Sequence, residues 1–470
     1  MPIPRNMTYA HLPMKYLGYL VLGILLVMSI VFYKERTLFV DVAFQTFKMI
    51  TEGGWQVQVN RFGSGLVHAL PLAAIRMELP LWMVLLSYSL SFTLLFLLLY
   101  HITVQWLKNE WMGFAIPLLF TLNTFDGFYW ATSELQQGLA VLLVYFAFLL
   151  KYPAPSKWWQ WAVIILGIPL LATYHPVMFI PFFFMWGFFW LSDERFRNST
   201  FYVVLLVMIV FLLVKSSFMG NHYDAGKMAE FWNNFDAYYP NLLKLPSNKI
   251  FLTRSIKFWY FFPLLFIFEN GWYLWKKQWA KAILLTGFSL VFLLITHIGS
   301  PHTTYRFYAE VNYMPLTLFV ILPLLFDIVP NIKKKRLVVL LFSLIFVIRL
   351  VTIYNHHRPY SNRIVWLQEQ LDNIQRNYTS NKVIIPFTKE LEDRLYMTWG
   401  IPYESLLLSS MNNREHSMTI FVPKGGEPSL VRDIQVQDLW FASDFGAINS
   451  DEISDNVYFD LKRDVYIIVH

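Results

Sequence analysis

The stretch YLGYLVLGILLVMSIVFYKERTLFVDVAFQTFKMI (residues 16–50) decides the fold class of this chain. Its first half is an apolar run at 16–33, which is long enough to cross a bilayer, and no small-residue cleavage site follows it. Its second half repeats apolar residues at helical spacing and carries one acid, Asp41, among them. A helix this short and this polar does not span a membrane. We therefore expect an uncleaved first span followed by a helix at the membrane surface.

The whole chain has the composition of a polytopic membrane protein. It has 470 residues and a mean hydropathy of +0.43, with 56% hydrophobic and only 15% charged residues. A soluble domain usually has about a quarter charged residues. Aromatic residues make up 19% of the chain, which suits wide aromatic belts at both membrane surfaces. The absence of cysteine from the sequence excludes disulfides, thiolate catalysis and cysteine-bound metals.

Apolar runs separated by charged, proline or glycine breaks predict an all-α polytopic fold with about eleven transmembrane helices. The runs lie at 16–33, 78–100, 111–123, 137–151, 158–173, 176–192, 200–215, 256–273, 281–297, 313–329 and 336–354. Lysine and arginine gather in alternate breaks, such as KKKR at 333–336, and these breaks are expected in the cytoplasm. We therefore expect a multi-pass protein of the cytoplasmic (inner) membrane with a cytoplasmic N-terminus. Its long extracytoplasmic loops are then 34–77, 216–255 and 298–312.

A composition shift near residue 355 predicts two domains, a transmembrane domain at 1–354 and a small extracytoplasmic α/β domain at 355–470. The second domain has 11 Lys and Arg against 16 Asp and Glu, so the basic excess of the chain lies in the first. That excess follows the positive-inside rule, and we expect no nucleic-acid partner. Apolar spacing predicts a helix over 364–374. Strands are predicted at KVIIP (382–386), MTIFVP (418–423), VYFDL (457–461) and VYIIV (465–469).

Ionisable residues gather at the outer ends of the predicted spans. The chain has no P-loop, no His-Glu-x-x-His and no G-x-S-x-G signature. Charges at a membrane edge are costly and are functional hypotheses by default. The candidates are Asp41, Arg61, His68, Asp126, Glu134, His175, His297, His302, Arg306 and Glu310. Their convergence on one face predicts a site at the outer membrane surface.

The acids of this group have both a chemical and a structural interpretation. Asp41, held at the height of lipid headgroups, would deprotonate a hydroxyl acceptor, or it is a solvated acid on a surface helix. Asp126 belongs to a common turn dipeptide, and Glu134 suits the start of a helix. Asp41 and Asp126 together would offer oxygen ligands to Mg²⁺ or Mn²⁺, although their spacing defines no metal site, and no other cofactor is indicated.

The basic candidates also have two interpretations. His175 precedes a proline that opens a helix, or it donates to a phosphate. Arg306 lies among Tyr305, Phe307 and Tyr308, where it either anchors a helix or binds phosphate in a bidentate manner. Arg349 lies about 8 Å below the outer end of the last run, counted at about 1.5 Å per residue. It either snorkels outward from the lipid or meets a lipid phosphate in a cavity between helices.

The first external loop resembles that of the GT-C superfamily of membrane glycosyltransferases. Asp41 in TLFVDVAFQTF matches the acid that follows the first span in this family. GGWQ (53–56) and RFGSGLVHALPLAAI (61–75) look like the return of the loop into the second span, with His68-Ala69-Leu70-Pro71 where relatives often have His-Pro-Pro. The resemblance covers residues 10–354 at the level of topology. It implies transfer of a sugar from a polyprenyl-phosphate donor to a hydroxyl of a glycan, lipid or protein.

The resemblance implies a role for each candidate residue. Asp41 would be the catalytic base, and Asp126 a second acid that orients the acceptor or a metal. The donor phosphate would be bound by Arg306, Arg349, His175 and Arg61, while His68, Glu134 and Glu310 would line the acceptor side. Two other classes remain open: a lipid or oligosaccharide transporter or polymerase-like envelope protein, and a non-catalytic subunit of a membrane complex. A central pathway would indicate transport, and the absence of a polar site would indicate a scaffold.

Overall fold

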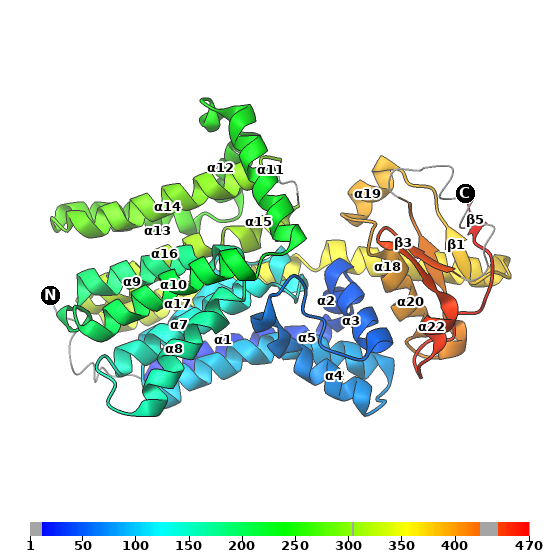
Figure 1. Ribbon diagram of the computed structural model, residues 1–470, viewed down its shortest axis with the longest axis horizontal. Coiled ribbons are helices and arrows are strands. Elements are labelled where there is room, and N and C mark those ends of the chain that lie inside the picture. The colour runs from blue at the N-terminus through cyan, green and yellow to red at the C-terminus, as the bar shows by residue number, and fades with distance from the viewer. Residues whose placement is uncertain (1–11, 303–304, 424–439, 470) are drawn as a thin grey trace.

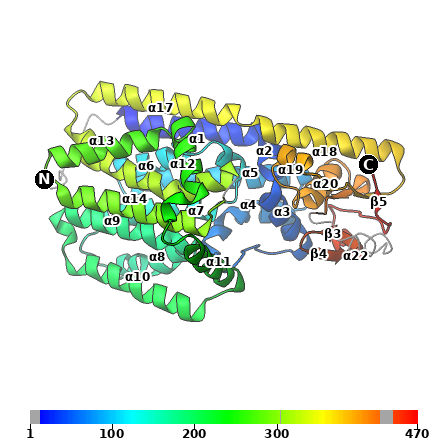
Figure 2. The ribbon, with the colours of Figure 1, turned by 90° about the horizontal axis from the view of Figure 1, so that it is seen from above.

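The computed structural model of the protein describes residues 12–302, 305–423 and 440–469. The chain is mostly helical, and long helices lie side by side in a bundle (Figure 1). The N-terminus lies at one end of this bundle, and the C-terminal helices and strands gather beyond the other end. Seen from above, α17 leads into α18 along nearly the same line, so one helical rod joins the two parts (Figure 2).

Each of the eleven predicted apolar runs coincides with a helix. These are α1 (Leu12–Val31), α5 (Leu81–His101), α6 (Glu110–Thr121), α7 (Glu134–Lys151), α8 (Trp158–Ala172), α9 (Phe179–Ser192), α10 (Ser199–Phe218), α13 (Phe261–Trp275), α14 (Trp279–Gly299), α16 (Met314–Pro323) and α17 (Lys335–Asn355). Within the described residues, 7 helices are long and apolar enough to cross a membrane, or 8 if the bent pair of α12 and α13 counts as one. The class of helical membrane protein is supported, whereas eleven spans are not confirmed.

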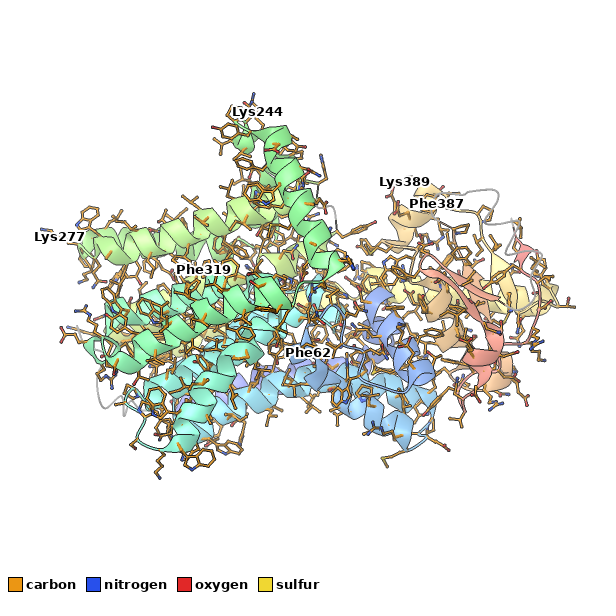
Figure 3. The ribbon with its side chains drawn as sticks, viewed as in Figure 1. Phe62, Lys244, Lys277, Phe319, Phe387 and Lys389 are labelled. Atoms are coloured by element: carbon orange, nitrogen blue, oxygen red, sulfur yellow. The ribbon has the colours of Figure 1, made fainter. Side chains whose placement is uncertain are left out.

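Three helices form the centre of the bundle. Every residue of α16 is buried, and α6 and α7 are buried along most of their length. Helices α10, α14 and α17 pack around the outside and leave large apolar side chains exposed, for example Leu206, Leu290 and Leu344. An apolar outer surface over a packed interior is what a bundle in lipid requires, because water is absent there. Figure 3 shows Phe319 of α16 inside this bundle.

The segment between α1 and α5 contains α2 (Tyr33–Thr37), α3 (Val40–Glu52), the 3₁₀ turn η1 (Phe62–His68) and α4 (Ala69–Arg76). The predicted helix after the first span is therefore confirmed as α3. It does not lie on an open surface, because both of its sides are covered by protein. Val42 and Met49 pack into the core of the bundle, while Ala43 and Phe47 pack into a second core with the C-terminal part. A helix with apolar residues on two sides buries both when two partners are available.

The C-terminal part contains helices and short strands, and its status as a separate α/β domain stays a prediction. It contains α18 (Arg358–Asn377), β1 (Lys382–Ile384), α19 (Lys389–Leu395), α20 (Ile401–Ser410), β2 (Thr419–Phe421), β3 (Trp440–Ser443), β4 (Gly446–Asn449), α22 (Ser450–Ser454) and β5 (Ile467–Ile468). Strands β2, β1 and β5 form a parallel sheet in that order. Helix α18 confirms the predicted helix over 364–374. The core of this part includes residues of α3 and α4, so it packs against the segment between α1 and α5, and the boundary at 355 stays a prediction.

One strand prediction differs from the structure, and one pair of strands was missed. The stretch 457–461 is not a strand, because the Asn456 side chain accepts hydrogen bonds from the N–H groups of Tyr458 and Phe459. These two aromatic side chains are buried, and burial of a short apolar run does not by itself distinguish a strand from a loop. The antiparallel pair β3 and β4 was not predicted.

The remaining connections lie at the end of the bundle nearest the C-terminal part. They include η3 (Asp126–Tyr129), α11 (His222–Tyr238), η6 (Leu242–Lys244), α12 (Pro246–Lys257) and α15 (Arg306–Asn312). Helices α11 and α12 project sideways from the bundle, and α12 meets α13 at 90° (Figure 1). Shorter turns are η2 (Ile102–Trp106), η4 (Pro176–Met178), η5 (Glu194–Phe196), η7 (Leu324–Ile328), η8 (Val329–Asn331) and η9 (Arg414–His416).

Candidate functional site

Asp126 is the centre of a charged cluster at the end of α6. Its carboxylate Oδ2 lies 2.8 Å from Arg306 Nε, and Oδ1 lies 3.0 Å from His356 Nδ1. The Asp126 side chain is 3% exposed, while that of Arg306 is 24% exposed. Arg306 Nη2 also donates to the hydroxyl of Tyr396 at 3.2 Å, so the C-terminal part contributes to this cluster. Both carboxylate oxygens of Asp126 thus have partners. Asp126 is therefore better suited to position Arg306 than to act as a free base.

Glu310 holds the loop that carries Asp126. Its carboxylate accepts the backbone N–H groups of Phe125 at 3.0 Å, Asp126 at 3.3 Å and Gly127 at 2.6 Å. A Cβ on Gly127 would lie 3.2 Å from Glu310 Oε2, so glycine permits this close approach. Burial raises the pKa of Glu310 and the charge of Asp126 adds to this, while the three N–H donors oppose it. Glu310 therefore positions the loop that carries Asp126, and its expected place on the acceptor side stays a prediction.

Arg349 fixes the same loop from the other side. Its side chain is 1% exposed, and its three nitrogens donate to backbone carbonyls. The acceptors are Thr121 O at 3.0 Å, Phe258 O at 3.2 Å and Thr124 O at 3.3 Å. Arg349 faces protein, as expected for a deep charge, but its guanidinium satisfies the carbonyls at the end of α6. The expected phosphate-binding role gains no support from this geometry.

Asp41 lies in the first turn of α3, and the residue as a whole is half-buried. Its Oδ2 accepts a hydrogen bond from Trp130 Nε1 at 3.0 Å, and the Tyr308 hydroxyl interacts with the same carboxylate. Within the described residues, no cation lies at ion-pair distance from Asp41. Burial raises the pKa of Asp41 to about 6, and Glu134 adds to the increase, while the two hydrogen bonds oppose it. An acid with this pKa and no cationic partner is suited to accept a proton near neutral pH.

The backbone next to Asp41 is strained and is held by the C-terminal part. Val40 has a φ of +32°, which is unfavourable for a β-branched residue. Its N–H donates to Glu404 Oε1 at 2.8 Å, and Glu404 forms a buried ion pair with Arg363 at 2.7 Å. Strain beside a candidate catalytic group supports a functional hypothesis when the surroundings enforce it, and here an ion pair does so.

Arg61, Glu134 and His175 form a group whose charges act on one another and on Asp41. Arg61 Nη1 is 3.3 Å from Glu134 Oε1, and Arg61 Nη2 is 3.8 Å from Asp224 Oδ1. Burial lowers the pKa of His175 to about 3, and the charges of Arg61 and Lys215 add to this. His175 Nδ1 accepts the N–H of Val177 at 3.3 Å, so the ring caps the turn η4, which opens at Pro176.

His68 belongs to a buried hydrogen-bond network that contacts α3 through Gln45. Its Nε2 lies 3.3 Å from Gln45 Oε1 and 3.2 Å from the Tyr88 hydroxyl, and Thr132 Oγ1 donates to Gln45 Oε1 at 2.9 Å. Burial lowers the pKa of His68 to about 4, so the ring is neutral at pH 7. Gln45 follows Asp41 by one helical turn, so this network fixes the orientation of α3.

Nine of the candidate residues form two neighbouring clusters joined by Trp130, whereas His297 bonds to Asn248 of α12 and His302 lies beside Tyr238 of α11. One contains Asp126, Arg306, Glu310 and Arg349, and the other contains Asp41, Arg61, His68, Glu134 and His175. In the parts of the chain that the structure describes, no group of three or more His, Asp or Glu is arranged to hold a metal ion. The described residues therefore give no support to the expected Mg²⁺ or Mn²⁺ site on Asp41 and Asp126.

Sequence reasoning missed several members of these clusters. His356, Trp130, Tyr308 and Tyr396 come from loops or short helices whose sequence carries no periodic signal.

A buried acid within the bundle was also missed. Glu269 of α13 is fully buried, and neither carboxyl oxygen has a hydrogen-bond partner among the described residues. Nearby Asp327 accepts hydrogen bonds from Lys281 at 2.7 Å and from the Tyr273 hydroxyl at 2.6 Å.

No protein-family model, no curated protein and no solved structure matches this chain.

Proposed function

We propose that this protein is a membrane glycosyltransferase of the GT-C type, which moves a sugar from a polyprenyl-phosphate donor to a hydroxyl acceptor. The observation that carries the proposal is the Asp41 carboxyl group. It lacks a cationic partner among the described residues, burial raises its pKa to about 6, and the residue as a whole is half-buried. A strained backbone held by Glu404 fixes its position at the outer end of the bundle.

In the proposed reaction Asp41 accepts the proton of the acceptor hydroxyl. The acceptor oxygen then bonds to the anomeric carbon, and the bond from that carbon to the phosphate oxygen breaks. The lipid phosphate leaves with the electron pair, so a single displacement inverts the configuration. Arg306 is partly exposed, and its position is set by Asp126, so it is suited to stabilise the negative charge of the leaving phosphate.

The proposed topology assigns a side of the membrane to each part of the fold. All eleven apolar helices cross the cytoplasmic membrane, the N-terminus is cytoplasmic and the C-terminal part is extracytoplasmic. Asp41 and Arg306 then face the outer leaflet, where the donor and a glycan, lipid or protein acceptor meet. Protease added to intact spheroplasts should cleave a tag at the C-terminus, whereas cleavage only in inside-out vesicles would contradict this topology.

The transfer activity is tested with protein in proteoliposomes that contain a pool of polyprenyl-phosphate sugars. Asp41→Asn should lower the rate of sugar transfer by about 10²–10⁴-fold, which is the usual contribution of a general base. Asp236→Asn is the matched control. It makes the same replacement of carboxylate by amide at an exposed acid of α11. Arg306→Gln should reduce the amount of polyprenyl phosphate that copurifies, as measured by mass spectrometry. Equal rates for the two aspartate variants would contradict the proposal.

A transporter is the second candidate, and one observation favours it. Ion-coupled carriers need an ionisable group inside the membrane, and Glu269 is a buried acid within an apolar helix of the bundle. In proteoliposomes with a pH gradient, a transporter would move protons through the wild-type protein and not through the Glu269→Gln variant. A transferase would show no such difference.

A further inference from the structure

Helices α11 and α12, with η6 between them, form an arm that projects sideways from the bundle at the end where the two charged clusters lie (Figure 1). The structure places α12 at 90° to α13, which runs along the bundle. A helix perpendicular to the spans at the end of a bundle lies in the plane of the membrane surface. Figure 3 shows Lys244 at the tip of this arm, far from the C-terminal part.

The inner face of α12 is held by the bundle. Ser247, Phe251 and Ser255 follow one another by one turn, and all three are buried. Asn248 Oδ1 bonds to the ring of His297 at the end of α14, and the Ser247 N–H donates to Pro301 O at 3.0 Å. Arg254 interacts electrostatically with Arg306 and Asp126, so the arm also adjoins the Asp126 cluster. The arm is therefore a fixed part of the fold.

The outer face of α12 is apolar and basic. Leu252 is 63% exposed and Ile256 one turn later is 76% exposed, and Lys249 and Lys257 flank them on the same face. Leu243 at the tip is 93% exposed. An open groove of about 550 Å³ runs along this face, and its lining includes Leu243, Lys244, Lys249, Leu252 and Ile256.

The charged residues of η6 and α12 are all basic. Residues 242–257 contain Lys244, Lys249, Arg254 and Lys257 and no acidic residue. Exposed apolar side chains with lysines beside them are the signature of a helix whose apolar face enters the headgroup region while its lysines meet lipid phosphates. Helix α11 has no buried residue and adds the exposed side chains of Met228 and Trp232.

We propose that the outer face of α12 and the tip of the arm form a binding surface for the headgroups of anionic phospholipids. The apolar side chains Leu243, Leu252 and Ile256 enter the acyl boundary, and Lys244, Lys249 and Lys257 contact lipid phosphates. The occupant is the bilayer itself, because the arm lies perpendicular to the spans and carries the opposite charge to such lipids. This inference does not rest on the proposed transferase activity.

The position of the arm is tested with spin labels, for which the absence of native cysteine makes each introduced cysteine unique. Leu252→Cys, Ile256→Cys and, as the control in the C-terminal part, Lys389→Cys each receive a nitroxide in vesicles of phosphatidylcholine and phosphatidylglycerol. The labels at 252 and 256 should collide with oxygen and lose access to a water-soluble nickel complex, while the label at 389 keeps that access. Equal nickel access at all three positions would overturn the proposal.

The preference for anionic lipid is tested by counting lipids retained on the purified protein. The triple variant Lys244→Gln, Lys249→Gln and Lys257→Gln should lose phosphatidylglycerol and keep phosphatidylcholine. The matched control changes three exposed cations of the C-terminal part, Lys389→Gln, Arg394→Gln and Lys462→Gln, and should retain both lipids as the wild type does. Retention of phosphatidylglycerol by the arm variant would overturn the anionic preference, whatever the transferase assay shows.

Discussion

The indole Nε1 of Trp130 lies 3.0 Å from the Oδ2 of Asp41, and this hydrogen bond joins α3 to the loop that carries Asp126. Trp130 follows η3 directly, and its ring also meets those of Phe307 and Tyr308 edge to face. The two charged clusters are thereby connected through one aromatic side chain. We therefore expect a substitution of Asp41 or of Asp126 to affect the other cluster through this contact.

Asp41 should give the transfer activity a dependence on pH. Its pKa in the folded protein is about 6, above the ordinary value of 3.8. A base must be deprotonated, so the rate should rise with pH through about 6 and then level off. Initial rates measured between about pH 4 and 8 test for this rise. The Asp41→Asn variant should not show it. A rise centred near pH 4 would contradict the raised pKa.

The same group should affect stability in the opposite direction. The folded protein holds the Asp41 proton in a range where the unfolded chain has released it, so stability falls as the pH rises from about 4 to about 6. Asp41→Asn should make the unfolding temperature less dependent on pH across this range. The exposed control Asp236→Asn should leave the pH profile as in the wild type.

Arg349→Leu should destabilise the protein. The variant removes three donors and leaves the carbonyls of Thr121, Thr124 and Phe258 without them, with an expected loss of about 3 kcal/mol or more. Thermal unfolding in detergent measures it. Arg358→Leu changes an exposed arginine at the start of α18 and should stay within about 0.5 kcal/mol. A fully stable Arg349→Leu variant that loses donor lipid would restore the phosphate-binding role.

Gly400→Ala should separate α20 from the strained backbone beside Asp41. A Cβ at position 400 would lie 2.7 Å from the Cα of Val40, and backbone atoms cannot turn aside as a side chain can. We expect a loss of about 1–3 kcal/mol and a lower rate of transfer, because Val40 and Asp41 must move. Gly226→Ala in α11 is the control, since no atom lies within 4 Å of the place that its Cβ would take, and alanine there should stabilise by up to about 1 kcal/mol.

Glu269 and Asp327 should respond differently to the same substitution. Glu269 is buried with no hydrogen-bond partner among the described residues, and a charged carboxylate is unfavourable there, so Glu269→Gln should be tolerated. Asp327→Asn leaves the ammonium group of Lys281 without its counter-ion and should lower stability by about 3 kcal/mol. Unfolding temperatures of both variants measure this. A large loss for Glu269→Gln would show that Glu269 is ionised and paired.

The local features of this protein are determined by the sequence. All eleven apolar runs form helices, and α3 and α18 follow the predicted helical spacing, because these elements depend on neighbours within a few residues. The parallel strands β1, β2 and β5 were also recognised from short apolar runs. The concentration of ionisable groups at one end of the bundle could be read from the positions of the runs.

Tertiary structure decided which partners these groups have. Asp126 meets Arg306 and His356, which are 180 and 230 residues away in the chain, and no local pattern reports such pairs. Helix α3 was expected at an open surface, yet a second core from the C-terminal part covers its other side. Arg349 was expected to bind phosphate, yet it donates to the carbonyls that end α6. Spacing along a helix fixes which side chains share a face. What covers that face, and which charge meets which, depends on segments that only folding brings together.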